Sequence, residues 1–358
     1  MSTEKKNLLE VRNLTVHYET DEGIVEAVNN VSFDIAPGEI LGVVGETGAG
    51  KTTIALSIMG LLPKPPAHVI SGSIKLDGEE FLPSLPEPEG PFDFAKKGPW
   101  KAEQKKLELR FREIRGKKVS MMFQDPMTAL NPVLYVGDQI AEVIKIHENI
   151  SAAEAEKRAG DMLEVVGIPR ERYKEYPHQF SGGMKQRVVI AIALACHPDL
   201  IIADEPTTAL DVTIQAQVLQ LLRNLQKEYG TAIMLITHDF GVVAEICDRC
   251  MVIYAGEKVE SGNLEHIFDK NMHPYTRGMF ESLPNLEEDT DRLKPIKGLM
   301  PNPMDLPSYC SFAERCDVCE EICKSRNPEL IEVEPGHEVA CILVTEKLAA
   351  QNNAKEVK

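Results

Sequence analysis

The stretch that decides the fold is Gly45-Glu46-Thr47-Gly48-Ala49-Gly50-Lys51-Thr52, which matches the pattern G-x-x-x-x-G-K-S/T. An apolar run, Ile40–Val44, precedes it, and a helix-like stretch that begins at Thr53 follows it. Glycines in such a loop let successive backbone N–H groups turn toward phosphate oxygens, and the following helix presents its positive end to the same anion. Lys51 is expected to neutralise the β- and γ-phosphates, and the Thr52 hydroxyl to ligate Mg²⁺. The sequence therefore predicts a nucleoside triphosphate site that comprises this segment and Thr53.

Length, composition and charge restrict the class of protein. With 358 residues, the chain has room for one large α/β domain plus a small appendage, or for two modest domains. The net charge of −17 argues against nucleic acid as the main partner, because binding to a phosphate backbone needs a basic face. Residues 1–7 lack a signal-peptide core, and the longest apolar run, Val188–Cys196, is shorter than the roughly 20 residues that span a bilayer. We therefore expect a cytoplasmic protein that reaches a membrane only through partners.

Hydrophobic patterning along the chain predicts an α/β protein. Ser151 and Glu154 form a capping box for a helix that runs to about Val166. We expect loop over residues 81–99, helix over 101–118, 213–229 and much of 131–187, and a disordered tail over 346–358. Apolar runs bounded by turn residues predict strands over Leu8–Tyr18, Ile24–Ile35, Ile70–Leu76, Leu200–Ala203, Thr231–Ile236 and Met251–Ala255.

Two acidic residues follow the predicted strand Leu200–Ala203. In P-loop enzymes the first acid at such a strand end holds Mg²⁺, directly or through water, which assigns that role to Asp204. The next residue, Glu205, is placed to orient or deprotonate the attacking water. Two acids after an apolar run are usually just a solvated strand end, but the loop at Gly45 favours the catalytic interpretation.

A Ser-Gly-Gly turn, Ser181-Gly182-Gly183, precedes the apolar stretch Val188–Ala195. Two glycines, free backbone N–H groups and a helix N-terminus make it a second candidate anion site. The segment Phe180–Arg187 closely resembles the signature sequence of the ATP-binding-cassette family. In that family the signature of one subunit caps the γ-phosphate held by the loop of another, so that ATP is buried in a head-to-tail dimer. The resemblance implies that one chain carries half of each active site.

Four further positions match motifs of the same family. Gln124 matches the glutamine loop that contacts Mg²⁺ and the membrane subunit, and Asp211, in Ala209-Leu210-Asp211, matches the loop across the dimer interface. His238 matches the switch histidine that senses the γ-phosphate, and with Gln124, Lys51 and Glu205 it completes the implied catalytic set. Tyr18 matches the aromatic residue that stacks on adenine, although a tyrosine at a strand end could equally be packing. The resemblance implies a RecA-like α/β core, an antiparallel β subdomain and a helical signature subdomain over about residues 125–187.

Within this family the chain resembles the ATPase subunits of oligopeptide and dipeptide permeases. The resemblance covers residues 8–342 and rests on Gln124–Pro132, on Met184 in the signature and on His273-Pro274-Tyr275-Thr276-Arg277. It implies an ATP-hydrolysing subunit with a cassette over residues 8–270 and a C-terminal domain over 271–345. The acidic, proline-rich segment Pro83–Lys105 is longer than the usual link in this family and is expected to be a surface loop.

The same resemblance implies a set of partners. These are a second ATPase subunit, identical or homologous, two transmembrane permease subunits at the cytoplasmic face of the membrane and, indirectly, an extracytoplasmic solute-binding protein. A nickel or other small-solute importer is the alternative, because close relatives share every motif above. A soluble cassette ATPase acting on nucleic acid is disfavoured by the net charge of −17.

Eight cysteines without an export signal are expected to be reduced thiols, metal ligands or redox groups. The family resemblance implies that four of them bind a 4Fe–4S cluster, namely Cys310, Cys316, Cys323 and Cys341. Spacing alone also fits a zinc site with four cysteine ligands, in which Cys316 and Cys319 form one arm. Cys319 departs from the family pattern and could compete as a ligand. Cys247 and Cys250 precede the predicted strand at Met251 and are expected to be ordinary core residues.

Overall fold

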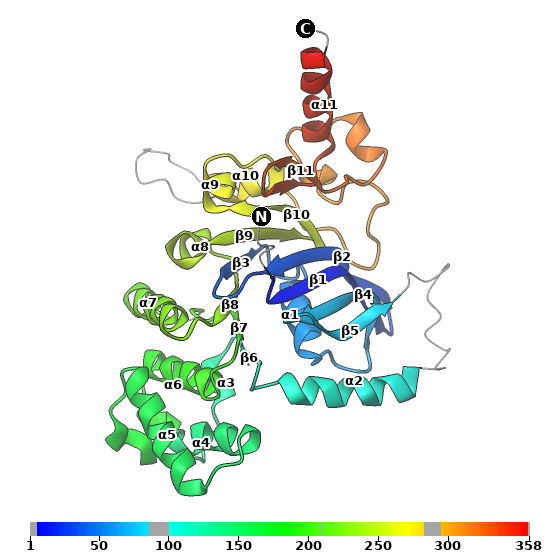
Figure 1. Cartoon of the computed structure of the whole chain (residues 1–358). Coiled ribbons are helices and arrows are strands. Elements are labelled where there is room, and N and C mark those ends of the chain that lie inside the picture. The colour runs from blue at the N-terminus through cyan, green and yellow to red at the C-terminus, as the bar shows by residue number, and fades with distance from the viewer. Residues whose placement is uncertain (1–5, 86–99, 209, 283–294, 357–358) are drawn as a thin grey trace.

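The computed structural model describes residues 6–85, 100–208, 210–282 and 295–356. Two β-sheets and a cluster of helices make up the molecule (Figure 1). The expected surface loop Pro83–Lys105 lies outside the described residues except at its ends, where the prediction was wrong, because they belong to a strand (Glu79–Leu85) and a helix (Trp100–Ile114). Ala209 also lies outside the described residues. Within the described ranges, every helix is too short or too polar to cross a membrane.

The larger sheet has the strand order β11-β12-β10-β9-β3-β8-β7-β6. Its centre, from β9 to β6, is parallel, and the remaining strands are antiparallel. Strands buried on both faces need continuous apolar runs, and β3 and β8 have them. The strands are β3 Ile40–Val44, β6 Val119–Met122, β7 Leu200–Asp204, β8 Ala232–Thr237, β9 Arg249–Tyr254, β10 Glu257–Asn263, β11 Ile331–Glu334 and β12 His337–Val339.

The smaller sheet is antiparallel, with the order β2-β1-β4-β5. It comprises β1 Leu9–Thr20, β2 Gly23–Ile35, β4 Ala67–Leu76 and β5 Glu79–Leu85. The prediction of loop from residue 81 onward was wrong at its start, because β5 pairs with β4 across Asp77-Gly78. Both turn residues have positive φ, 50° and 80°, which is the conformation that an Asp-Gly hairpin turn requires.

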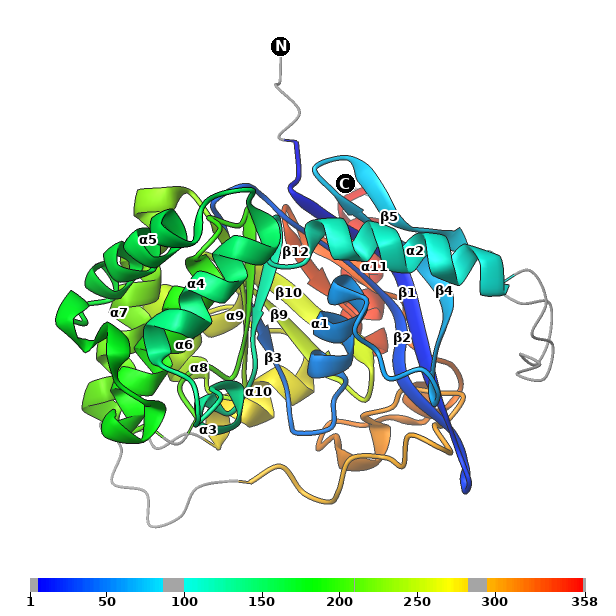
Figure 2. The same cartoon turned by 90° about the horizontal axis from the view of Figure 1, so that it is seen from below.

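Helix α1 Lys51–Met59 lies between the two sheets (Figure 2). Its apolar residues Ile54 and Ile58 share one buried cluster with Leu41 and Val43 of β3 and with strands of the smaller sheet. Ile40 and Val44 of β3 belong to the other cluster, which includes residues of the signature helices. Because successive side chains of a strand point to opposite faces, β3 packs into both clusters directly before the loop that follows it.

The helical region lies beside the larger sheet, at the opposite side from the antiparallel sheet (Figure 1). Ser151 caps α5 by accepting a hydrogen bond from the Glu154 backbone N–H, as the sequence predicted. Besides α1, the α-helices of the described residues are α2 Trp100–Ile114, α3 Pro126–Ala129, α4 Val136–His147, α5 Ala152–Val165, α6 Gly182–Leu194, α7 Val212–Tyr229, α8 Phe240–Ile246, α9 Leu264–Phe268, α10 Pro274–Glu281 and α11 Ile342–Glu356.

The C-terminal region differs from the sequence prediction in two ways. A separate small domain was expected, but β12 pairs with β10 and so extends the larger sheet. The expected disordered tail from residue 346 is wrong up to Glu356, because α11 runs from Ile342 to that residue. Residues such as Leu343, Leu348 and Ala349 favour helix, and the polar composition of the tail obscured this propensity.

Candidate active site

The loop between β3 and α1 is held against the backbone of both sheets. A Cβ atom at Gly45 would lie 2.2 Å from the Ile253 carbonyl oxygen, and one at Gly50 would lie 2.3 Å from the Ala27 carbonyl oxygen. Gly50 also has φ of 100°, in the left-handed region that favours glycine. Only glycine therefore fits at these two positions. Thr47 and Gly48 are exposed at its tip, while Ala49 is buried.

Lys51 begins α1 and turns its side chain back into this loop. Its Nζ atom donates hydrogen bonds to the Gly45 carbonyl oxygen at 2.7 Å and to the Glu46 carbonyl oxygen at 2.9 Å. Burial lowers the pKa of the Lys51 ammonium, and the charges of Glu205 and Asp204 oppose that effect. The loop thus holds a buried cation among oxygen acceptors, at the position where the sequence predicted phosphate.

Two predicted Mg²⁺ ligands meet at the start of α1 and the end of β7. The Thr52 hydroxyl donates to the Asp204 carboxylate at 2.9 Å. Burial raises the pKa of Asp204, and the hydrogen bond from Thr52 lowers it in part. A buried carboxylate paired with a hydroxyl is a suitable oxygen donor set for a hard divalent cation.

Glu205 is the centre of a polar cluster just beyond β7. Its carboxylate accepts hydrogen bonds from Gln124 Nε2 at 3.0 Å and from the Thr208 hydroxyl at 2.9 Å, and it lies 3.1 Å from His238 Nδ1. Burial acts to raise the pKa of Glu205, but the hydrogen bonds from His238 and Thr208 and the charge of Lys51 lower it overall. The structure therefore brings three predicted catalytic residues into contact and keeps the carboxylate ionised. Thr208 was not predicted, and only its place three residues after Glu205 could have indicated it.

Tyr18, the predicted adenine platform, stands at the other end of the site. Its hydroxyl lies 3.3 Å from the Thr53 hydroxyl, so it adjoins the first turn of α1. The ring is half-buried and therefore leaves part of its surface open. Tyr18 thus adjoins the start of α1, and its stacking on adenine stays a prediction.

The signature turn and the Asp211 loop form a second group of predicted residues. A Cβ atom at Gly183 would lie 2.5 Å from Ile214 Cγ2 on α7, so the turn packs closely against that helix. Ser181 caps α6, and Asp211 caps α7 by accepting from the Ile214 backbone N–H at 3.0 Å. Ser181, Gly182 and Asp211 are exposed. Among the described residues, no hydrogen bond or ion pair joins this group to the phosphate-binding loop.

Two contacts to the loop come from distant parts of the chain and were missed. The Tyr275 hydroxyl accepts a hydrogen bond from the Glu46 backbone N–H at 2.9 Å. Arg315 holds the Glu46 carboxylate with both terminal nitrogens, at 3.0 and 3.1 Å. Tyr275 lay in a motif that the sequence had singled out, but no local signal pointed to its partner.

Comparison with known proteins identifies the family. Residues 28–208 match the family model described as "ABC transporter", and residues 259–323 match "Oligopeptide/dipeptide transporter, C-terminal region". The chain belongs to the ABC transporter family. It is 45% identical over 347 residues to the oligopeptide transport ATP-binding protein AppD of Bacillus subtilis, with 96% of this chain and 99% of the relative covered. It is also 45% identical over 343 residues to OppD of Escherichia coli, with coverage of 95% and 94%.

Solved structures of ABC cassettes share the fold. One is a dimeric post-hydrolysis state of an ATP-binding cassette bound to ADP and Pi, with a TM-score of 0.57, 28% identity and coverage of 72% of this chain and 98% of that chain. Another is cbiO1 of Clostridium perfringens, with a TM-score of 0.58, 27% identity and coverage of 74% and 92%. The predicted ABC fold is thereby confirmed for the cassette.

The cysteines divide into two groups, as the sequence indicated. Cys247 and Cys250 are buried in the core. Over the described part of the chain, no group of three or more His, Cys, Asp or Glu side chains is arranged to hold a metal ion. The predicted 4Fe–4S or zinc centre is therefore not supported by the side-chain geometry. Burial raises the pKa values of the Cys310, Cys316 and Cys341 thiols, and the neighbouring thiols, Cys323 among them, add to that effect.

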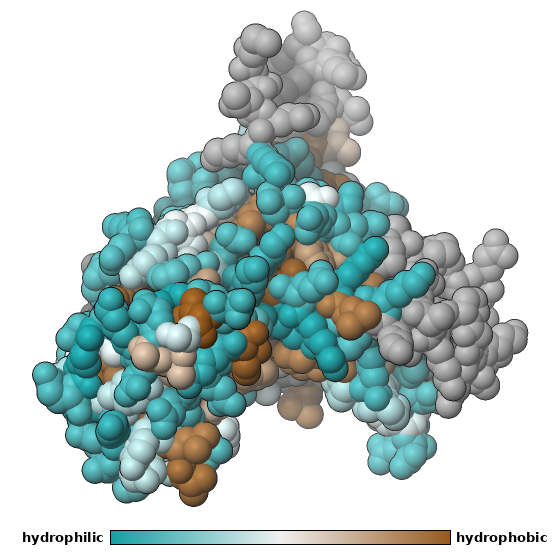
Figure 3. All heavy atoms as spheres, turned by 60° about the horizontal axis from the view of Figure 1, so that its bottom comes forward, coloured by the Kyte–Doolittle hydropathy of each residue, from teal (hydrophilic) through white to brown (hydrophobic). Residues whose placement is uncertain are grey.

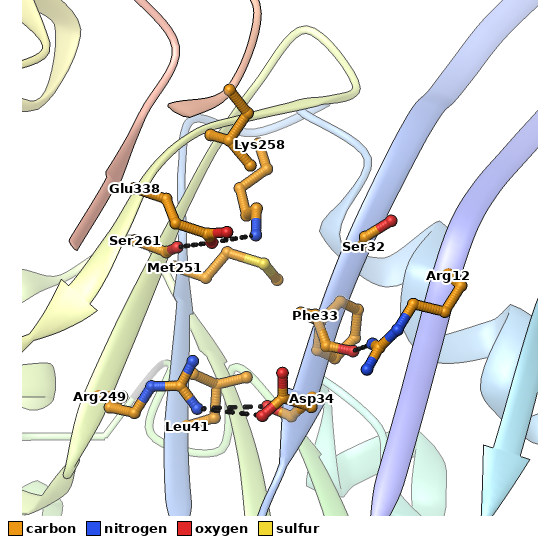
Figure 4. Close-up of a pocket in the computed structure, with 11 residues that line it drawn as sticks. Arg12, Ser32, Phe33, Asp34, Leu41, Arg249, Met251, Lys258, Ser261 and Glu338 are labelled. Atoms are coloured by element: carbon orange, nitrogen blue, oxygen red, sulfur yellow. Dashed lines mark hydrogen bonds and ion pairs between the residues drawn. The ribbon is translucent and has the colours of Figure 1, made fainter. Parts of the chain in front are cut away.

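A polar pocket lies away from the nucleotide residues, between the smaller sheet and strands β9, β10 and β12 (Figure 4). Its volume of about 220 Å³ is below that of typical small-molecule sites. Lys258 pairs with Glu338 at 2.6 Å, and Arg249 pairs with Glu39 at 3.0 Å and with Asp34 at 3.6 Å. Because these cations are already paired, the pocket offers an anion little free charge.

Proposed function

We propose that this chain is the ATP-hydrolysing subunit of an importer for di- and oligopeptides. One observation carries the proposal: ATP-binding proteins of oligopeptide transport are 45% identical to it over nearly its whole length. The geometry of the site supports the ATPase part, because Glu205, Gln124 and His238 are in contact next to Lys51 and Asp204.

In this proposal each residue of the cluster has a defined part in hydrolysis. Lys51 exchanges its carbonyl partners for the β- and γ-phosphate oxygens of ATP, which it neutralises in a buried site where charge acts strongly. Thr52, Asp204 and Gln124 would hold Mg²⁺, which when bound neutralises phosphate charge. Glu205 orients the attacking water or accepts its proton, and its lowered pKa keeps it ionised for either task. His238 fixes the orientation of the Glu205 carboxylate and senses the γ-phosphate.

Tyr18 stacks on adenine, and the backbone from Gly45 to Thr53 surrounds the phosphates. The exposed signature turn and Asp211 face the loop of a second cassette, identical or homologous, in a head-to-tail dimer. Their exposure and their separation from the chain's own loop support this arrangement, as does the dimeric state of the related cassette bound to ADP and Pi. Two such composite sites would close on ATP and reopen after hydrolysis.

The membrane partners in this proposal are two permease subunits that dock at the cytoplasmic face, with an extracytoplasmic solute-binding protein acting through them. Large apolar side chains are exposed next to Gln124 and further along the same segment, and they support a protein contact there, namely Phe123, Val133 and Leu134. Figure 3 shows the molecule with the bottom of Figure 1 turned forward, and there hydrophobic patches interrupt a mainly hydrophilic surface. Nucleic acid is not among the proposed partners, since the net charge is −17.

We also propose a 4Fe–4S cluster on Cys310, Cys316, Cys323 and Cys341. The residue types suit the cluster, because four thiolates are its usual ligands and the other three thiols act on the pKa of Cys310, although the described side chains are not arranged as a metal site. The backbone N–H of Cys310 donates to the Cys323 carbonyl oxygen at 3.3 Å, which joins two members of the set. Burial raises the pKa of Cys310 to about 12 and that of Cys316 to about 11, so binding would release protons. Zinc on the same residues is the competing outcome.

Uptake into proteoliposomes tests the substrate class. The chain is assembled with its permease subunits and partner ATPase, and uptake of a labelled dipeptide and of labelled Ni²⁺ is measured with ATP on the cytoplasmic side. The proposal predicts peptide uptake that Lys51→Ala abolishes, whereas uptake of Ni²⁺ alone would favour the nickel importer. Iron, sulfide and zinc analysis after anaerobic purification tests the cluster separately, with Cys323→Ser as the variant that should lose it.

A further inference from the structure

The C-terminal region contacts the phosphate-binding loop at three separate points. Tyr275 accepts a hydrogen bond from the Glu46 backbone N–H. Met300 lies so close to the loop that a Cβ atom at Gly48 would be 3.3 Å from its Cε atom. Arg315 binds the Glu46 side chain. These residues come from α10 and from the segment that follows residue 294, so the loop of the cassette is partly enclosed by the region that the peptide branch adds.

The contact of Arg315 with Glu46 is the strongest of the three. Two parallel N–H···O bonds, at 3.0 and 3.1 Å, form a bidentate fork, which is the most specific geometry of an ion pair. The Arg315 side chain is only 7% exposed, and that of Glu46 is 31% exposed. The Nε–H group of Arg315 donates to the Lys297 carbonyl oxygen at 3.0 Å, and its Nη1 also donates to the Tyr254 hydroxyl at 3.4 Å. Arg315 is therefore held by contacts outside the loop as well as by Glu46.

The position of Glu46 makes this pair important for nucleotide binding. Its backbone carbonyl accepts a hydrogen bond from Lys51 Nζ at 2.9 Å, so the residue adjoins the cation assigned to phosphate. A carboxylate at this place repels a polyphosphate unless a cation neutralises it. Arg315 supplies that charge from 269 positions further along the chain.

We propose that Arg315 is a positioning residue of the nucleotide site. It neutralises Glu46 and holds the phosphate-binding loop from the C-terminal region, so this region is a working part of the ATP site. The inference rests on the proposed function, since it assumes that the loop binds Mg–ATP.

Isothermal titration of the purified full chain with Mg–ATP at constant ionic strength tests the inference. Arg315→Ala leaves the Glu46 charge unopposed and should raise the Kd about tenfold, which corresponds to about 1.4 kcal/mol. Glu46→Gln combined with Arg315→Ala should return the Kd to within about threefold of the wild type, because no repelling charge then remains. Arg315→Lys, which keeps the charge without the fork, should rescue most of the affinity. Arg326→Ala, at an exposed arginine of the same region, is the matched control and should bind normally.

Thermal unfolding of each variant separates this role from a purely structural one. A purely structural role would lower the Tm of Arg315→Ala while leaving its Kd for Mg–ATP at the wild-type value. Alternatively, the Kd of the Glu46→Gln, Arg315→Ala double variant would stay as high as that of Arg315→Ala. Either result overturns the inference. If Arg315→Ala does not fold, Glu46→Gln decides alone: it should bind Mg–ATP more tightly, and unchanged or weaker binding contradicts the inference. Lys51→Ala is titrated in parallel and should lose Mg–ATP binding. A wild type that binds no more tightly than this variant contradicts the proposed function, whereas a wild type that binds Mg–ATP leaves only the role of Arg315 to be decided.

Discussion

Replacing Glu205 by glutamine separates catalysis from binding. One carboxylate oxygen accepts from Gln124 and Thr208, and a glutamine carbonyl oxygen in the same place keeps both hydrogen bonds. The new amide group would face His238 Nδ1, which can accept in its other tautomer. The substitution thus removes the negative charge and retains the contacts, so the unfolding free energy should change by less than about 1 kcal/mol. Turnover should fall by about 10²- to 10⁴-fold, the usual contribution of general acid–base catalysis.

The assay is phosphate release by the assembled transporter at saturating ATP, together with the Kd for Mg–ATP of the chain. Glu245→Gln makes the same chemical change at an exposed position of α8 and should leave both quantities unaltered. The Glu205 variant should bind Mg–ATP at least as tightly as the wild type, because the site loses a negative charge near the phosphates. Turnover within about fivefold of the wild type would refute the assignment, since water activation must then depend on another group.

Three further predictions follow from the same geometry. Tyr18→Ala should weaken Mg–ATP binding by about 1–3 kcal/mol through loss of base stacking, while Tyr18→Phe should bind almost normally, as measured by titration calorimetry. Gly50→Ala should lower the unfolding free energy by at least about 2 kcal/mol in urea titrations, because its Cβ would lie 2.3 Å from the Ala27 carbonyl oxygen. Burial lowers the pKa of His273 to about 4, so the unfolded state binds more protons between about pH 6.5 and 4. Stability should therefore fall as the pH drops through that window, and His273→Asn, which keeps a cap for α10, should make the urea-measured dependence less steep.

The nucleotide site was predictable where its signals are local in the sequence. The glycines and Lys51 lie within one short segment between a buried strand and a helix, so the pattern alone predicts the loop. Glu205 and Asp204 were predicted from the end of an apolar strand. That Gln124 and His238 would meet Glu205 followed only from the family resemblance, because nothing in the three segments reveals their distance in space.

The C-terminal region was predicted least well, because its contacts are made over long stretches of chain. The pairing of β12 with β10 joins Val339 to Glu260, and short strands of this kind have little periodicity of their own. The contacts of Tyr275 and Arg315 with Glu46 depend on tertiary packing that no local pattern encodes. Cysteine spacing indicated a metal site that the described side chains do not form. Spacing along the chain shows which residues are able to meet, but tertiary packing decides whether they do.

The most direct test of the account measures phosphate release and labelled peptide uptake in the same proteoliposomes, with wild-type chain and with Lys51→Ala. The account predicts that both rates depend on added peptide and solute-binding protein, and that both are lost in the variant. Peptide uptake that persists in Lys51→Ala, or ATP hydrolysis by the wild type that never responds to peptide, would contradict it.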